Sequence, residues 1–352
     1  MLADYDFELP PERIAQTPPT QRGKSRLLVL DRQKGTLLHR QFSDLPEFLD
    51  AGDLLVLNDS RVFPARLRFR RQPSGGRGEL LCLQPEAGTH HWRAIGRPGK
   101  ALRIGEVLAL DDDETTAHPI ARQEREVIVE FRRGDEKLPV DDVFALCEQH
   151  GEIPLPPYID RSPATDSAAL DRERYQTVYA AQPGSAAAPT AGLHFTSEIL
   201  ETVQDRGILT ATVTLHVGLG TFQPLTAESF EAPTLHRERI VVDESARKKI
   251  ECPGQSGRRI VAAGTTTARV LESLPIPLPK ASPYSTATDL FIKPGHKFRY
   301  VDALITNFHL PRSSLLVLVS AFAGRERISA AYAEAISEKY RFYSYGDAML
   351  IL

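Results

Sequence analysis

The sequence predicts an α/β protein: a discontinuous α/β core, residues 1–62 and 151–352, with an inserted antiparallel β-barrel-like domain at residues 63–150. A length of 352 residues suggests roughly two domains. Short alternating apolar runs, separated by Gly- and Asp-rich turns, fill residues 62–135 without a helical period. Strand and helix patterns alternate after residue 151, and the apolar strands before residue 62 need that part as their packing partner.

The first and middle parts of the chain contain clear strand signals. Residues 25–40, "SRLLVLDRQKGTLLHR", predict a hairpin that turns at Gly35, and "GDLLVLND" at 52–59 predicts a buried strand that ends in a polar pair. After the β segment, "VDDVFALCEQHG" predicts a helix that ends at Gly151.

The α/β part has its own start and stop signals. Thr196 is expected to cap a helix that ends before Gly207. Further strands are expected at 208–218, 258–264 and 303–311, and further helices at 243–251, after 264 and twice after 313. The Pro/Ser/Thr-rich segment 274–288 is expected to be a mobile loop.

Composition excludes several classes of protein. A formal net charge of −3 gives no nucleic-acid signature for the chain as a whole. The three cysteines form no C-x-x-C pair, so neither a zinc site nor a disulfide framework is expected, and a reducing cytoplasm suits them. The start lacks the apolar core of a signal peptide, and the apolar run 315–323 is too short to cross a bilayer.

Four loops that follow predicted strands hold polar residues, at 58–61, 214–222, 263–269 and 306–311. Open α/β sheets bind ligands at such strand ends. In "AGTTTAR", a helix N-terminus, a glycine and three hydroxyls could hold a carboxylate, a phosphate or a ribose; the alternative is that Thr265 only caps the helix. The glycines of "HVGLG", Gly218 and Gly220, favour a site loop at the end of the strand expected at 208–218.

Three histidines, His194, His216 and His309, lie beside small residues or proline at predicted loops. Each could be a satisfied core residue, but together they favour an acid–base site. Their spacing does not match a metal site, so no metal is expected. Asp59 in "NDSR" and Asp347 in "SYGDAML" are the accompanying carboxylates, with a simple turn as the alternative at each.

The stretch 61–77 contains six arginines and no acidic residue. A solvated strand face is one reading. Arginine without neighbouring acids also suits phosphate contacts, so an RNA-binding β module is expected. The expected RNA contacts are Arg61, Arg66, Arg68, Arg70 and Arg71.

Several long segments resemble one family: "NDSRVFPARL", "ERYQTVYA", "GSAAAPTAGLHFT", "VTLHVGLGTFQP", "AGTTTARVLES", "TDLFIKPG", "VDALITNFHLPRSSLLVLVSAFAG" and "YRFYSYGDAMLI". They are similar to the signature segments of the S-adenosylmethionine:tRNA ribosyltransferase-isomerases of queuosine biosynthesis. The resemblance runs from Tyr5 to the C-terminus and is weakest at about 68–150. Departures include Ser60 in place of Thr, Leu235 in place of Met and His296 in place of an aromatic residue.

The resemblance implies a reaction. The ribosyl part of S-adenosylmethionine is transferred to 7-aminomethyl-7-deazaguanine at the tRNA wobble position and isomerised, which releases adenine and methionine and gives epoxyqueuosine. The C5′–H beside the sulfonium needs a base, and the departing adenine needs an acid. We expect His194, His216, His309, Asp59 and Asp347 to serve the chemistry, and Gly264, Thr265, Thr266, Thr267, Gly218 and Gly220 to hold S-adenosylmethionine.

The resemblance also implies partners and surroundings: S-adenosylmethionine as co-substrate, a tRNA with a queuosine-type anticodon, no metal, no membrane, and a cytoplasmic monomer. Three alternatives remain. A sugar-phosphate transferase would need an acidic pair before the GTTT loop, which "RRIVAAGTTT" lacks. A non-catalytic tRNA-binding protein leaves the strand-end loops unexplained. A methyltransferase would need a Gly-rich turn after an early strand.

Overall fold

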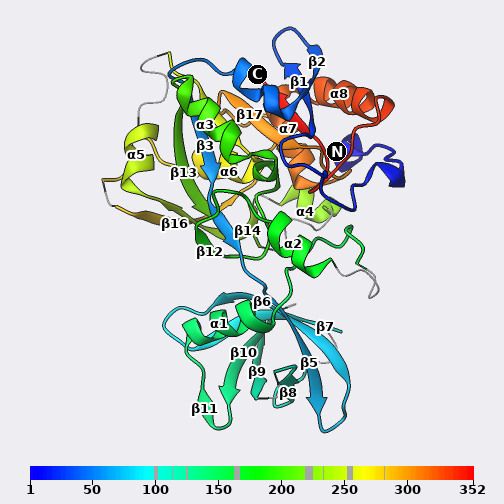
Figure 1. The fold of residues 1–352 in the computed structure, drawn as a ribbon, viewed down its shortest axis with the longest axis vertical. Coiled ribbons are helices and arrows are strands. Elements are labelled where there is room, and N and C mark those ends of the chain that lie inside the picture. The colour runs from blue at the N-terminus through cyan, green and yellow to red at the C-terminus, as the bar shows by residue number, and fades with distance from the viewer. Residues whose placement is uncertain are drawn as a thin grey trace.

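The computed structural model describes residues 1–98, 102–112, 114–123, 126–161, 167–218, 225–232, 234–251, 257–280 and 282–352. Figure 1 shows an upper body of sheet and helices, which contains both termini, and a lower β-rich body with helix α1 (Val140–His150). The chain passes from the upper to the lower body just after strand β3. The end of β3 therefore lies on the side of the upper body that faces the lower one.

The upper body is built on a nine-stranded sheet, here the large sheet. Its strands, in spatial order, are β16 (Tyr284–Leu290), β14 (Thr234–Val242), β13 (Leu209–Leu215), β3 (Leu54–Asn58), β15 (Ile260–Ala263), β17 (Ala303–Asn307), β18 (Ala348–Ile351), β1 (Arg26–Asp31) and β2 (Thr36–Gln41). The four strands from β13 to β17 are parallel to one another. β18 is antiparallel to β17 and parallel to β1.

The central strands of the large sheet, β3, β15, β17 and β18, are buried throughout, so both faces of the sheet are covered there. On strand β1, Leu28 and Leu30 join one core, whereas Leu27 and Val29 join the other. Helices α6 (Thr265–Ser273), α7 (Ser314–Ala323) and α8 (Arg325–Ser337) contribute to the first core. Helix α3 (Ser197–Asp205) and the 3₁₀ segment Phe42–Phe48 contribute to the second.

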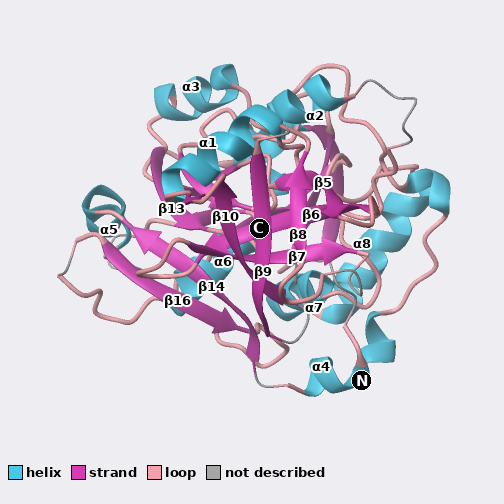
Figure 2. Cartoon of the chain, turned by 90° about the horizontal axis from the view of Figure 1, so that it is seen from below, coloured by secondary structure: helices cyan, strands magenta, loops and turns pink. Residues whose placement is uncertain are grey.

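The lower body contains an antiparallel sheet of seven strands, here the ring sheet: β5 (Arg66–Gln72), β6 (Arg77–Pro85), β7 (His91–Arg97), β8 (Val107–Leu110), β9 (Thr115–Gln123), β10 (Glu126–Arg133) and β11 (Glu136–Lys137). β9 also pairs with β10, so six strands form a closed ring. Phe69, Trp92 and Phe131 fill it, and Leu146 of α1 packs against them. Figure 2 shows this ring from below, with the large sheet behind it.

The remaining elements connect or flank the two sheets: β4 (Ser60–Val62), β12 (Gln182–Ser185), α2 (Ala168–Arg174), α4 (Ala227–Glu231), α5 (Glu244–Ile250) and the 3₁₀ segments Leu2–Tyr5, Pro11–Arg13 and Thr190–His194. The predicted α/β class with an antiparallel β segment is confirmed. The domain boundaries at 62/63 and 150/151 stay a prediction. In the described ranges, no helix is long and apolar enough to span a membrane.

One expectation was wrong. The segment 274–288 was expected to be a mobile loop, but its last part belongs to strand β16. The alternating residues Thr286 and Thr288 pair with Ile240 and Glu238 of β14. Threonine favours strands, and pairing with β14 supplies backbone hydrogen bonds to β16. The Pro-rich composition of the segment as a whole did not indicate this strand.

Candidate active site

The carboxyl ends of four parallel strands meet at one edge of the large sheet, here the strand-end edge. Asn58 ends β3, His216 follows β13, Gly264 follows β15 and Asn307 ends β17. Ala348 of β18 pairs with Asn307, so Asp347 lies at the same edge. The structure therefore brings the predicted strand-end loops together.

Asn58 links three of these elements. Its Nδ2 donates to the carbonyl of Leu215 (3.2 Å) and to Oγ1 of Thr266 (3.3 Å). Its Oδ1 accepts from the amides of Ser60 and Leu215, both at 3.1 Å. The side chain is fully buried and tied on both atoms, so it fixes β3, β13 and α6 relative to one another.

The small-residue segment 184–194 lies across the strand-end edge. At β13, the Val217 amide donates to Ser185 Oγ (3.0 Å). At β15, a Cβ on Gly264 would lie 3.6 Å from Ala191. At β17, Thr190 Oγ1 donates to Asn307 Oδ1 (3.2 Å). The main chain thus packs directly on the sheet edge, which explains why the sequence before His194 has so little bulk.

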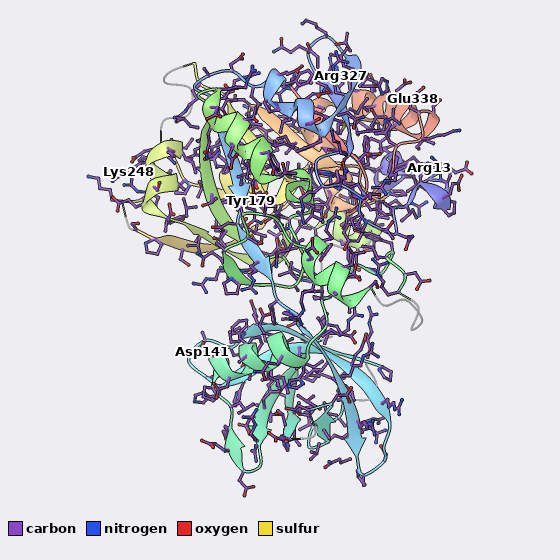
Figure 3. The ribbon with its side chains drawn as sticks, viewed as in Figure 1. Arg13, Asp141, Tyr179, Lys248, Arg327 and Glu338 are labelled. Carbon is purple, nitrogen blue, oxygen red and sulfur yellow. The ribbon has the colours of Figure 1, made fainter. Side chains whose placement is uncertain are left out.

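Gly192 shows how tight this packing is. A Cβ at Gly192 would lie 2.2 Å from the hydroxyl oxygen of Tyr179, too close for any side chain. Tyr179 lies within the upper body (Figure 3), and its hydroxyl is buried without a hydrogen-bond partner among the described residues. Burial, and then the negative charge of Asp59, raise the pKa of Tyr179.

The N-terminus of α6 is buried and lacks a side-chain cap. The N-cap residue is Gly264, with φ +96°, and not Thr265, so the simple capping alternative is wrong. Thr265, Thr266 and Thr267 are all buried. Thr267 Oγ1 donates back to the Ala263 carbonyl (2.7 Å) and does not cover the helix end. A buried helix end with free N–H groups attracts an anionic or polar ligand.

His216 has a free ring nitrogen at this edge. Its Nδ1 is buried and has no partner among the described residues. Burial, and then the charge of Arg239, lower the pKa of His216 to about 4. The ring is neutral at pH 7, and a Cβ on Gly184 would lie 3.3 Å from it. Gly218, two residues on, donates its amide to Glu238 Oε1 (3.1 Å), and Gly220 lies outside the described residues.

Asp59 lies next to Asn58 and is 8% exposed. Its Oδ1 accepts from Thr214 Oγ1 (2.7 Å). Burial raises the pKa of Asp59, although hydrogen bonds from Thr214 and Thr212 act in the opposite direction. A cavity of about 250 Å³ lies nearby, between α3, α5 and β13, with Tyr179 and Thr212 in its wall.

The other three predicted acid–base groups are hydrogen bonded inside the protein. His194 bonds to Ser25 Oγ (2.8 Å) and Asn307 Nδ2 (3.1 Å), His309 bonds to Thr306 Oγ1 (2.7 Å), and Asp347 accepts from the amides of Arg26 and Arg341 (both 2.8 Å). Burial lowers the pKa of both histidines to about 3 and raises that of Asp347. For His194, the charges of Arg341 and Arg22 add to burial.

The arginines expected to contact RNA project from β4 and β5, and most have carboxylate partners. The ion pairs are Arg61–Glu148 (3.2 Å), Arg66–Glu79 (3.8 Å), Arg68–Glu152 (2.7 Å) and Arg71–Glu106 (3.8 Å). Arg70 is exposed and has no ion pair among the described residues. The expectation that these arginines lack counter-charges was wrong, because β6, the residue before β8, helix α1 and the segment after α1 supply the acids.

Sequence reasoning missed two sets of residues. Asn58 and Asn307 are the amides that organise the edge, and their signal was a polar residue at the last position of an apolar strand. The buried ion pair between Arg269 and Glu238 gave no signal, because the two residues lie far apart in the chain. No cluster of three or more metal-ligating His, Cys, Asp or Glu side chains occurs in the part of the chain that the structure describes.

The comparisons with known proteins agree with the resemblance. A family described as "Queuosine biosynthesis protein" matches residues 2–351. The S-adenosylmethionine:tRNA ribosyltransferase-isomerase of Anaeromyxobacter dehalogenans (strain 2CP-C) is 48% identical over 353 residues, which cover 100% of this chain and 99% of the relative. The enzyme of the same name from Moorella thermoacetica is 46% identical over 356 residues, with the same coverage.

A solved structure matches as well. The crystal structure of S-adenosylmethionine tRNA ribosyltransferase from Thermotoga maritima is 38% identical, covers 99% of this chain and 100% of its own, and superposes with a TM-score of 0.55. The match extends over both sheets. The chain therefore belongs to the S-adenosylmethionine:tRNA ribosyltransferase-isomerase family of queuosine biosynthesis, a family of enzymes.

Proposed function

We propose that this enzyme transfers the ribosyl moiety of S-adenosylmethionine to 7-aminomethyl-7-deazaguanine at the tRNA wobble position and isomerises it to epoxyqueuosine. Adenine and methionine are the released products. The observation that carries the proposal is the buried, uncapped N-terminus of α6, which lies at the strand-end edge with the free Nδ1 of His216. Family membership supplies the class of reaction.

S-adenosylmethionine binds at the N-terminus of α6 in this proposal. The free amides of Thr265, Thr266 and Thr267 donate to the carboxylate or the ribose oxygens of the co-substrate, and the dipole of α6 favours the carboxylate. Gly264 allows close approach of the co-substrate, and Gly218, in the loop after β13, leaves open space where a side chain would stand. Gly220, outside the described residues, keeps its predicted role in the same loop.

Proton transfer is assigned first to His216. Its imidazole is neutral at pH 7 and has an unpaired ring nitrogen, so it can accept the proton from the carbon beside the sulfonium. Asp59 is the second candidate, for proton transfer to departing adenine; burial raises its pKa and so favours the protonated form relative to an exposed carboxyl group. His194, His309 and Asp347 take positioning roles, because their hydrogen bonds hold the edge in place.

The tRNA contacts the outer face of β5. Arg66, Arg68 and Arg70 alternate with buried Leu67 and Phe69, so they share that face. Arg70 is exposed and has no ion pair within the described ranges, so it can meet a phosphate without losing one of these partners. Arg61, Arg66, Arg68 and Arg71 would exchange a glutamate for a phosphate, which reduces the net gain of each contact.

The wider organisation is part of the same proposal. Residues 1–62 and 151–352 form the catalytic core, and residues 63–150 form an inserted β-rich domain with a barrel-like ring. The distribution of strands between the two sheets supports this division. We propose that the enzyme works in the cytoplasm as a monomer and without a metal.

The test is direct. The protein is mixed with S-adenosylmethionine and tRNA that carries 7-aminomethyl-7-deazaguanine, and free adenine and epoxyqueuosine in the digested tRNA are quantified. Formation of both products at equal amounts supports the proposal. Binding of tRNA without either product would contradict it.

A further inference from the structure

Three arginines from distant parts of the chain hold the N-terminal segment Thr17–Arg22; we name Arg22, Arg174 and Arg341 the arginine cluster. Their partners are main-chain carbonyl oxygens: for Arg174, Pro19 (2.7 Å); for Arg341, Thr17 (3.2 Å) and Tyr345 (2.7 Å); for Arg22, Gln176 (2.8 Å), Leu193 (3.3 Å) and Glu173 (3.4 Å). Carbonyl oxygens satisfy the N–H groups but carry no net charge.

The positive charge of the cluster is therefore not neutralised by an ion pair. Within the described ranges, no carboxylate oxygen lies within the 4.0 Å salt-bridge distance of these three guanidinium groups. Burial and then the charge of Arg174 lower the pKa of Arg22, so the two cations lie close together. The nearby acids are Glu173, which is not paired with Arg22, and Asp347, which accepts from main-chain amides.

The cluster lies beside the strand-end edge. A small hollow of about 10 Å³ is lined by Pro18, Pro19, Arg174, Ser344, Tyr345 and His194. His194 bonds through Nε2 to Asn307 at the end of β17. Arg13 donates to the carbonyl of Lys339, two residues before Arg341, and so marks this region in Figure 3. Arg13 lies there on the side of the upper body opposite Lys248 of α5.

We propose that the arginine cluster binds phosphate groups of the RNA backbone and so aligns the tRNA with the strand-end edge. The inference rests on the proposed function, in which tRNA is the substrate. Guanidinium groups match phosphate oxygens, and such contacts set position, not sequence. All three guanidinium groups are half-buried and have no salt-bridge partner among the described residues, and Arg22 and Arg174 repel one another. A polyanion would remove that repulsion.

The competing explanation is that the arginines only clamp residues 17–22. Two kinds of substitution separate charge from clamping. Arg174→Gln keeps an N–H donor for the Pro19 carbonyl but removes the charge, whereas Arg174→Lys keeps the charge and loses the planar fork. Arg206→Gln is the matched control, because Arg206 is exposed, lacks an ion pair among the described residues, and lies just before the opposite end of β13.

The experiment measures tRNA binding over a series of NaCl concentrations for the wild type, Arg174→Gln, Arg174→Lys, Arg206→Gln and the triple Gln variant of the cluster. Each lost phosphate contact should reduce the log–log salt slope by about 0.7 and weaken binding roughly fourfold at 0.15 M salt. We expect these losses for Arg174→Gln and for the triple Gln variant of the cluster, and wild-type slopes for Arg174→Lys and Arg206→Gln.

Melting temperature is measured for every variant, and turnover of S-adenosylmethionine for the wild type. A lower melting temperature with an unchanged salt slope would overturn the proposal in favour of the clamp. If the triple variant does not fold, Arg174→Gln alone decides. Sodium phosphate and NaCl are also compared as inhibitors of tRNA binding at equal ionic strength. If phosphate inhibits more strongly while the salt slopes of the cluster variants equal that of the wild type, the cluster binds free phosphate and the proposal is wrong. Absence of wild-type turnover contradicts the proposed function only, since the slopes are measured independently.

Discussion

Two bidentate ion pairs of this protein have nearly the same geometry and different surroundings. Arg68 donates to Glu152 at 2.7 and 3.1 Å, with side chains that are 61% and 39% exposed. Arg161 donates to Asp171 at 2.8 and 2.8 Å, with side chains that are 20% and 6% exposed. Water competes for the hydrogen bonds of the first pair. The second pair is largely shielded from water and connects α2 to the N-terminal segment through the Gln16 carbonyl.

The contrast applies to the two bodies as a whole. Charged side chains on the outside of the ring sheet pair with one another at the surface, where each pair contributes about 0–1 kcal/mol. Polar side chains near the strand-end edge are buried and bond to main-chain groups and to other buried side chains. Losing one of them leaves its partner buried and unsatisfied. Polar and charged side chains of similar type therefore contribute more to stability in the upper body than in the ring sheet.

The largest effect is expected at His216. His216→Gln should lower kcat by about 100- to 10,000-fold, since general acid–base catalysis is of that size, with little change in tRNA affinity. Single-turnover kinetics with labelled S-adenosylmethionine measure the chemical step. His309→Gln is the comparison at a histidine whose Nε2 is already bonded within the protein, and a smaller loss is expected there. Equal losses in the two variants would remove the distinction between free and bonded histidines.

The second effect concerns the buried ion pair. Asp171→Asn should lower the free energy of unfolding by about 2–3 kcal/mol, because it leaves Arg161 without its counter-charge. The matched change Glu152→Gln at the exposed pair should cost less than about 1 kcal/mol. Urea unfolding at pH 7 measures both. Similar values for the two variants would show that burial does not distinguish the pairs.

The third effect is a dependence of stability on pH. His309 has its pKa lowered from 6.5 to about 3 by burial, so between these values the unfolded chain binds the proton and the folded protein does not. Stability should fall as the pH drops below 6.5, by about 1.4 kcal/mol per pH unit for each such histidine. Burial raises the pKa of Asp59 and Asp347, so the folded protein binds their protons more tightly than the unfolded chain does. This opposes the loss of stability only in the acidic range where carboxyl groups titrate.

Urea unfolding at pH 6.5 and pH 5.0 tests this dependence. His309→Gln should flatten the loss of stability relative to the wild type. His91→Gln is the control, because His91 lies on the surface of the ring sheet beside Glu130. An unchanged slope in His309→Gln would mean that the buried imidazole is not responsible.

The smallest effects are expected on the outer face of β5. Arg68→Gln should leave the salt slope of tRNA binding almost unchanged, because Arg68 already has a glutamate partner. Arg70→Gln should reduce the slope by about 0.7, as for one phosphate contact. Binding isotherms at several salt concentrations compare the two. A larger change for Arg68→Gln would show that its pair with Glu152 opens in the complex.

Local signals in the sequence were sufficient for much of the fold. Thr196 accepts from the Ile199 amide as an N-cap, Gly207 has a positive φ after α3, and Gly264 marks the turn from β15 into α6. These features depend on neighbours in the chain, so periodicity and cap residues reveal them. β14 and β16 were missed because each is polar and pairs with the other at the rim of the large sheet.

The location of the candidate site in the fold was predictable from the sequence, but the hydrogen-bond partners of its residues were not. The strand-end loops were identified because polar residues follow apolar strands. Which histidine keeps a free nitrogen could not be known, since Ser25 and Thr306 reach His194 and His309 only in the folded protein. The acid-free arginine stretch misled for the same reason: Glu148 and Glu152 approach Arg61 and Arg68 from the segment that follows the ring.

The position of β18 has a consequence for how the protein is made. This strand comes after all the others in the chain, yet it lies inside the large sheet, between β17 and β1. On the ribosome, β1 and β2 must wait for nearly the whole chain before their neighbour is synthesised. The ring sheet is contiguous in sequence and can close long before that. The strand-end edge, with Asp347 just before β18, is therefore completed last, after the ring sheet has formed.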